Sequence, residues 1–200
     1  MEGAALRPAG RVLPLLLAPL IAAAASVPPE TAPPLDALNA RLLAGASATR
    51  TLEDWCREHR LAADPHILAE RVAGPDKPIA PVQRARLGIG AKEAVRYRHV
   101  RLRCGTRVLS EADNWYVPSR LTPAMNAALD GSDVPFGTVV APLGISRHTF
   151  SVERPARPNG ETASPWLLRH RAIVRDRAGR PIAEVAESYR PALFDDAATP

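Results

Sequence analysis

The sequence predicts an α+β domain built on an antiparallel β-sheet with short helices. Two stretches, residues 94–117 and 166–191, predict the sheet, because each reads as two strands of alternating character joined by a turn. Helices are predicted by apolar residues at helical spacing within 35–43 and by the start and stop signals of residues 121–131. No period of 20–50 residues repeats, which excludes a repeat architecture.

Length and composition favour one folded domain with tails. The chain has 200 residues, and 46% of them are apolar, which is enough for a hydrophobic core. The formal net charge is +5, but the basic residues are scattered among acidic ones and no nucleic-acid-binding module is recognisable. We therefore expect no nucleic-acid partner.

The N-terminal segment has the three parts of a secretory signal peptide. Arg7 and Arg11 precede the apolar run VLPLLLAPLIAAAA at 12–25, and small residues follow it. The run is too short for a confident membrane span, so we expect cleavage near Ala25 and no stable span afterwards. The alternatives are an uncleaved anchor and an extension from a wrong start codon. A cleaved signal predicts a periplasmic or secreted protein.

The predicted organisation has four parts. A signal peptide covers 1–25, a Pro-rich lead-in covers 26–34, a single α+β domain covers 35–194, and a tail covers 195–200. We base the lead-in on its composition, since SVPPETAPP favours an irregular extended chain.

The first half of the domain carries two helix signals and one strand signal. Leucines at 35, 38, 42 and 43 predict the first helix, and a second is expected at about 51–60. Thr51 followed by Asp54 resembles a capping box, which would start that second helix at Thr51. A strand is expected at about 66–73, and Gly88 and Gly90 favour a bend within the ambiguous stretch 81–93.

The second half consists of two hairpins around short helices. In the first hairpin Val100 and Leu102 face one way, Arg101 and Arg103 face the other, and the return strand stops before Pro118. Residues 121–131 read as a helix with Thr122 as its N-cap. A helical turn near 134–144, a strand at 146–154, a Pro-rich loop at 155–165 and the second hairpin follow.

The two cysteines, Cys56 and Cys104, predict one disulfide if the protein is exported. The alternative is a pair of buried free thiols. His59 lies close to Cys56 in sequence, but catalytic Cys–His pairs usually join distant residues, so a disulfide is favoured over a nucleophile. No metal site is expected, because no cysteine or histidine pair has ligand spacing, and no cofactor motif is recognisable.

Glu187 is the strongest candidate for a catalytic residue. Strand alternation places it on one face with Val185 and Tyr189, two residues that are expected to be buried. A buried carboxylate must be paired, hydrogen-bonded or protonated. Glu187 is therefore either a general acid or one half of a structural ion pair with an arginine from a neighbouring strand.

Short motifs then appear in a characteristic order. The chain contains RHVRLRC at 98–104, WYVP at 115–118, PFG at 135–137, and Glu187, Tyr189 and Pro191 around the last strand. Over about half its length the chain resembles the chorismate pyruvate-lyase family and the wider superfamily that includes ligand-sensing domains of transcription regulators. The resemblance implies a chorismate lyase-like fold, an antiparallel sheet with helices folded over one side and a ligand cavity inside. It also implies that Glu187 is the general acid when chorismate is cleaved to 4-hydroxybenzoate and pyruvate.

One position departs from the lyase pattern. Where the lyases carry a carboxylate-binding arginine, this chain has Asn114, which cannot make the bidentate charged pair that arginine makes. An arginine from another strand could replace it, and the candidates are Arg98, Arg101, Arg103 and Arg147. The predicted ligand-binding residues are Asn114, Arg98, Arg101, Arg147 and Gly137.

Three functions are consistent with these patterns. The first is an exported protein that binds, or acts on, a small aromatic or carboxylated ligand in an internal cavity, without lyase activity. The second is a true chorismate lyase, which would be a carbon–oxygen lyase. The third is a non-catalytic periplasmic interaction protein.

Overall fold

The computed structural model describes residues 34–155 and 164–195. The expected signal peptide, nearly all of the Pro-rich lead-in, and the tail beyond Asp195 lie outside these residues. Within the described ranges no helix has both the length and the apolar character needed to cross a membrane.

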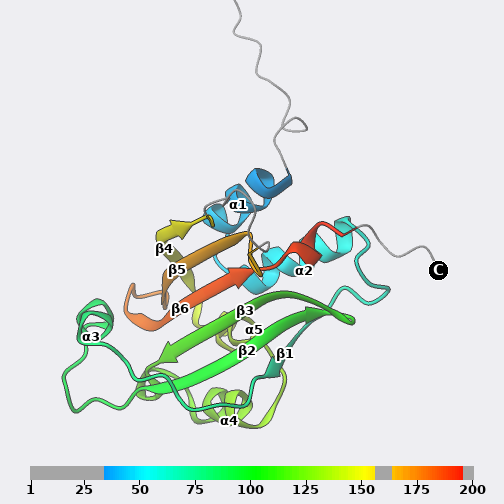
Figure 1. Ribbon diagram of the computed structural model, residues 1–200. Helices are drawn as coiled ribbons and strands as arrows, with labels where there is room; N and C mark the ends of the chain where they lie inside the picture. Colours follow the sequence, from blue (N-terminus) through cyan, green and yellow to red (C-terminus); the bar gives the residue numbers. More distant parts are fainter. Residues whose placement is uncertain (1–33, 156–163, 196–200) are drawn as a thin grey trace, which may run out of the picture. The chain divides into compact units, whose positions relative to one another are not determined.

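A single sheet of six antiparallel strands organises the described residues (Figure 1). The strand order is β1-β2-β3-β6-β5-β4, so the two predicted hairpins, β2–β3 and β5–β6, meet at the centre through β3 and β6. The bounds are β1 Ile67–Arg71, β2 Arg96–Cys104, β3 Arg107–Tyr116, β4 Ser146–Glu153, β5 Leu168–Arg175 and β6 Pro181–Tyr189. This confirms the prediction of an α+β fold with an antiparallel sheet.

Four of the five α-helices in the described part pack on one face of the sheet. These are α1 Pro34–Ala44, α2 Ala48–Glu58, α4 Pro123–Gly131 and α5 Phe136–Val140, whose apolar residues join the core clusters on that face. The remaining helix, α3 Pro81–Leu87, packs on the opposite face, where Leu87 contacts a small cluster with Val117 and Ile173. Single 3₁₀ turns at Pro118–Arg120, Ala141–Leu143 and Pro191–Leu193 complete the chain.

The sequence predicts where two helices begin, and the structure confirms one of these predictions and contradicts the other. Thr122 caps α4 as predicted, because its hydroxyl accepts a hydrogen bond from the Met125 amide at 3.1 Å. The prediction that Thr51 begins the second helix is wrong. Helix α2 begins at Ala48 with Ser47 as its N-cap, and the Thr51 hydroxyl instead donates to the Ser47 carbonyl at 3.2 Å.

The ambiguous stretch 81–93 forms a short helix followed by a turn, as its glycines indicate. Helix α3 ends at Gly88, whose φ of 61° lies in the left-handed region that glycine adopts without strain.

The helix-covered face holds two apolar clusters. One lies under α1 and α2 and includes Leu42, Leu52, Trp55 and Tyr189. The other lies under α4 and α5 and includes Leu129, Val140, Val174 and Val185. Several buried polar side chains lie where these clusters meet, and they form the candidate site described below.

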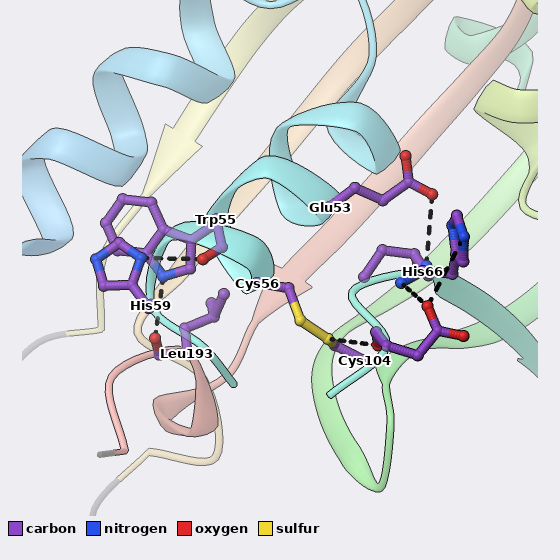
Figure 2. The surroundings of a disulfide bond; sticks show 9 residues. Glu53, Trp55, Cys56, His59, His66, Cys104 and Leu193 are labelled. Carbon is purple, nitrogen blue, oxygen red and sulfur yellow. Dashed lines mark hydrogen bonds and ion pairs between the residues drawn. A yellow bond between two sulfur atoms is a disulfide. The ribbon is translucent and has the colours of Figure 1, made fainter. Parts of the chain in front are cut away.

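Helix α2 is attached to the sheet near its C-terminal end (Figure 2). The sulfur atoms of Cys56 on α2 and Cys104 at the end of β2 lie at bonding distance, and the two Cα atoms are 6.5 Å apart, a separation compatible with a disulfide. The neighbouring Trp55 donates its indole N–H to the Leu193 carbonyl at 3.0 Å. The structure thus brings the predicted cysteine pair together; that the pair is oxidised stays a prediction.

Candidate ligand-binding site

Glu187 lies in β6 on the helix-covered face, as alternation predicts, and is only 6% exposed. Its Oε2 atom accepts hydrogen bonds from Arg147 Nη2 at 2.5 Å and from the Tyr189 hydroxyl at 3.0 Å. Of the two alternatives for a buried carboxylate, the structure therefore shows the ion pair. Burial, followed by the nearby carboxylate, raises the pKa of Tyr189 well above its ordinary value, so this hydroxyl remains a donor.

Arg147 reaches Glu187 from the edge strand β4. Its other terminal nitrogen donates to the Thr149 hydroxyl at 2.5 Å and to the Leu42 carbonyl at 3.2 Å. Burial disfavours the charge of this guanidinium, but Glu187 and Tyr189 together outweigh burial and raise the pKa of Arg147. The arginine is thus fixed on both sides and stays a buried cation.

His170 lies beside this pair, directly opposite Glu187 in the register of β5 and β6. The ring is fully buried, with Nε2 2.9 Å from Asn39 Oδ1 and no hydrogen-bond partner for Nδ1 among the described residues. Burial, reinforced by the charge of Arg147, lowers the pKa of His170 to about 4. A neutral His170 adds no charge at pH 7, so Arg147 is the cation that balances Glu187.

Arg98 and Asn114 form the second polar pair of the site. They are opposite each other in the register of β2 and β3 and are 2% and 3% exposed. Arg98 donates to the carbonyls of Ser132 and Val134 at 3.0 and 3.1 Å, and in the described part of the chain it makes no ion pair with a carboxylate. Burial, reinforced by the like charge of Arg71, lowers the pKa of Arg98.

The amide of Asn114 is buried without a partner. Neither its oxygen nor its nitrogen makes a hydrogen bond to any described residue. Buried side-chain amides are nearly always hydrogen-bonded, and leaving one unpaired costs about 1–3 kcal/mol. The position at which the lyases carry an arginine thus holds an unused donor and an unused acceptor.

These side chains line one small internal cavity of about 50 Å³. Its polar surface comes from Arg98, Asn114, Arg147 and Glu187, together with the hydroxyl-bearing Ser47 and Thr49. The apolar part of the lining comes from Val100, Leu102, Phe136, Ile145, Val174 and Val185.

Gly137 closes this cavity at the start of α5. A Cβ atom at this position would lie 2.6 Å from Ser47 Oγ and 3.0 Å from Thr49 Oγ1. Only glycine lets α5 approach the beginning of α2 this closely, so Gly137 shapes the wall of the cavity rather than offering a side chain to it.

The structure separates the four arginines proposed as replacements for the missing lyase arginine. Arg98 and Arg147 line the cavity, whereas Arg101 and Arg103 lie on the opposite face of the sheet. Arg101 is 3.8 Å from Glu111 and 4.0 Å from Glu70, and Arg103 is 2.7 Å from Glu70. Arg101 is therefore not a cavity residue, contrary to the prediction.

Sequence reasoning missed several residues of the site. Alternation predicts Tyr189 only as a buried residue, and no motif marks His170, Ser47 or Thr49. Across the described ranges no three His, Cys, Asp or Glu side chains gather closely enough to hold a metal ion.

Comparison with known proteins gives one close relative and a shared fold. No family model matches the chain. The chain is 43% identical over 178 residues to the uncharacterized protein y4mC of Sinorhizobium fredii, an alignment that covers 80% of this chain and 75% of y4mC.

Among solved structures, the effector domain of PhnF from Mycobacterium smegmatis superposes with a TM-score of 0.53 at 15% identity over 73% of this chain and 89% of that domain. A second PhnF structure gives a TM-score of 0.53 at 14% identity, covering 83% of each chain. The chain spans 62% of the length of YydK from Bacillus subtilis, with a TM-score of 0.44. The likeness to the PhnF effector domain confirms the predicted chorismate lyase-like α+β fold.

Proposed function

The chain belongs to the same family as y4mC of Sinorhizobium fredii, and we propose that it binds a small molecule bearing a carboxylate in the cavity beside Asn114. The observation that carries this proposal is the Asn114 amide, buried and unpaired on the cavity wall next to an arginine that has no carboxylate partner among the described residues. A bound ligand would supply the hydrogen bonds that Asn114 lacks.

The charges of the cavity favour one anionic group. Arg98 and Arg147 contribute two positive charges and Glu187 one negative charge, so the lining carries a single uncompensated positive charge. Because Arg147 is already paired with Glu187, the free charge belongs to Arg98. A ligand carboxylate beside Arg98 and Asn114 would offset the cost of burying that guanidinium.

The rest of the lining favours an apolar body attached to the carboxylate. Six aliphatic or aromatic side chains larger than alanine surround the polar group, including Val100, Phe136 and Val185. Apolar walls with a few placed polar groups are typical of small-molecule sites. An aromatic acid satisfies both parts of this lining.

Ligand entry requires the cavity to enlarge. Its 50 Å³ is enough for a few water molecules, whereas sites for organic ligands usually measure about 300–1,000 Å³. An outer hollow of about 500 Å³ adjoins the cavity, and Ala46, Ser47, Gly137 and Ile145 line both spaces. The segments 46–49 and 136–145 pack closely, but in the described structure no hydrogen bond or ion pair joins them, and we propose that they separate to admit a ligand.

Binding without lyase chemistry has the better support. A general acid must present a proton to the substrate, whereas the Glu187 carboxylate is held in an ion pair with Arg147, and the same Oε2 atom also accepts a hydrogen bond from Tyr189. The Glu187 carboxylate therefore acts as the anchor of Arg147 rather than as a free acid. The proposed role of Glu187 is to hold the arginine that forms one wall of the cavity.

A thermal-shift series tests the binding proposal. Benzoate, 4-hydroxybenzoate and the uncharged benzamide are each added to the wild-type protein and to two matched variants, Arg98→Met and Arg101→Met. These arginines lie three residues apart in β2 and on opposite faces. We expect the acids to raise the Tm of the wild type and of Arg101→Met, and to lose that effect with Arg98→Met. Equal shifts in the two variants would reject the site.

An assay with chorismate separates binding from catalysis. We expect chorismate to remain unchanged with purified protein, as followed by the absorbance of 4-hydroxybenzoate. Product formation that disappears with Glu187→Gln would replace the binding proposal with the lyase function.

Export is part of the proposal, and its support is the signal-like segment 1–25 together with the paired cysteines. Expression of the full chain with a C-terminal tag, followed by mass spectrometry of the periplasmic fraction, tests it. We expect a mature protein that begins near Ser26. Uncleaved protein confined to the cytosol would contradict export.

A further inference from the structure

A second hollow lies on the opposite face of the sheet, away from the cavity. It measures about 460 Å³, within the size range of small-molecule sites. Its lining includes two small residues of β6, Ala186 and Ser188, with arginines of β5 on one side and acidic residues of β3 on the other. Apart from Ala112, which lines both spaces, the residues of this open-face hollow play no part in the function proposed above.

The acidic side of the hollow has no unpaired carboxylate. Glu111 accepts from His99 at 2.7 Å and also from Arg190. Asp113 accepts from Lys77 Nζ at 2.7 Å. These contacts neutralise the β3 side, so it would neither attract a cation nor strongly repel an anion.

The basic side, in contrast, keeps unused donors. Arg169 lies over the ring of Trp166, with 4.4 Å between the guanidinium carbon and the ring centroid, and its Nε donates to Ser188 Oγ at 3.1 Å. Its only carboxylate neighbour in the described structure is Glu153, at 3.9 Å, and such an exposed, long ion pair is weak. Stacking and the serine contact therefore hold the guanidinium in place without using its two terminal nitrogens.

Arg171 supplies a second cation two residues along β5. One of its terminal nitrogens donates to the buried Glu184 at 2.8 Å, and its Nε has no hydrogen-bond partner among the described residues. Glu184 also accepts from Arg86, so this one carboxylate is shared by two arginines. The β5 side of the hollow thus has more positive charge than its carboxylates balance.

We propose that the open-face hollow binds the oxyanion of a small molecule, a phosphate or a carboxylate, through Arg169 with Arg171 alongside. A planar guanidinium binds such groups through two parallel hydrogen bonds, and one already held on a tryptophan ring loses little freedom on binding. The nearby Glu153 carboxylate competes for the same donors and weakens the site.

Tryptophan fluorescence can report this site because the three tryptophans differ in exposure. Trp55 lies away from the hollow and is 2% exposed; Trp115 and Trp166 both line the hollow, but Trp115 is only 7% exposed whereas Trp166 is half-buried. Iodide, an anionic quencher, should collect at Arg169 and quench Trp166 more than neutral acrylamide does. All samples are kept at one ionic strength, since exposed charges are screened by salt.

The expected results follow from the contacts of Arg169. Arg169→Gln should remove the excess iodide quenching, whereas Arg175→Gln, at a half-buried arginine of the same strand that donates to the Gly179 carbonyl, should leave it unchanged. Glu153→Gln should strengthen the excess by about twofold, the effect of removing one exposed charge pair.

Competition identifies the oxyanion. Inorganic phosphate and acetate are titrated separately against the iodide quenching of the wild type, and the better competitor names the preferred group. If neither anion competes, or if Arg175→Gln lowers the quenching as much as Arg169→Gln does, the effect is general surface charge and the site is refuted.

Discussion

Arg147 and Glu187 form a buried ion pair with 2.5 Å between Nη2 and Oε2, although they are 40 residues apart and strand β5 lies between their strands. The guanidinium and the carboxylate side chain are 2% and 8% exposed. The pair fixes the edge strand β4 to the centre of the sheet and forms part of the cavity wall. It is thus both a structural contact and a component of the proposed site.

Replacing one partner of the Arg147–Glu187 pair should lower the free energy of unfolding more than replacing both partners by apolar residues. Arg147→Met leaves the Glu187 carboxylate buried without its cation, and we expect it to lower the free energy of unfolding by about 3–5 kcal/mol. The double variant Arg147→Met/Glu187→Leu should lose less than the sum of the single variants. Urea unfolding measures both values.

Arg154 provides the control for this prediction. It pairs with Asp36 on the surface, with both side chains nearly half exposed, so Arg154→Met should cost at most about 1 kcal/mol. Equal losses for Arg147→Met and Arg154→Met would show that the buried pair contributes no more than a surface one.

Gly137 should tolerate no side chain. Gly137→Ala places a Cβ 2.6 Å from Ser47 Oγ, and we expect the resulting shift of α5 to cost about 1–3 kcal/mol, the usual cost of overpacking. Gly131→Ala is the matched control, because Gly131 lies within α4 and a Cβ there meets nothing within 4 Å. Thermal unfolding of the two variants measures the difference, and equal stability would mean that the segments at 47–49 and 137 are not in firm contact.

His170 should make the protein sensitive to mild acid. Its pKa is lowered from the usual 6.5 to about 4, so between these two values the unfolded chain binds a proton that the folded chain does not. The free energy of unfolding should therefore fall by about 3 kcal/mol as the pH decreases from 6.5 to 4, and this contribution is fully present above pH 6.5.

Two variants isolate this effect in urea unfolding at pH 7, 6, 5 and 4. His170→Gln should flatten the dependence on pH, whatever its effect on stability at pH 7. His66→Gln, at a side chain that is 79% exposed, should leave the dependence unchanged. Parallel curves for the wild type and His170→Gln would contradict the prediction.

The cysteine pair should stabilise the folded protein. If oxidised, Cys56 and Cys104 close a loop with a sequence separation of 48, and loss of the bond should cost about 4 kcal/mol in the loop-entropy account. Urea unfolding with and without reductant measures this, and Cys56→Ser/Cys104→Ser should show no response to reductant. Two titratable thiols in protein unfolded under non-reducing conditions would show that the bond does not form.

The alternation of apolar and polar residues along the strands was sufficient to predict the two central hairpins and the position of Glu187 in the site. Period-two patterning identified both hairpins and placed Glu187 with Val185 and Tyr189 because every residue of a central strand points to one of two faces. It also placed Arg101 opposite Val100, so the same pattern already argued against Arg101 at a cavity on the Val100 face.

Contacts between distant segments could not be predicted in this way. Arg147 was one of four candidate arginines, and only the pairing of β4 with β5 brings it to Glu187. Alternation puts Glu184 on the face opposite Glu187, and it is fully buried there because Arg86 and Gln83 of helix α3 cover it. Helix α3 has no local signal for the face on which it packs.

The Asn114 amide is the centre of the proposed ligand site, and Asn114→Leu tests its role. Leucine is close to asparagine in size, and the amide makes no hydrogen bond to any described residue, so the free energy of unfolding should stay the same or rise. Isothermal titration calorimetry with 4-hydroxybenzoate should then show binding to the wild type and at least tenfold weaker binding to the variant, the effect of about 1.4 kcal/mol. Equal affinity for the two proteins would contradict the proposal that the cavity beside Asn114 is the ligand site.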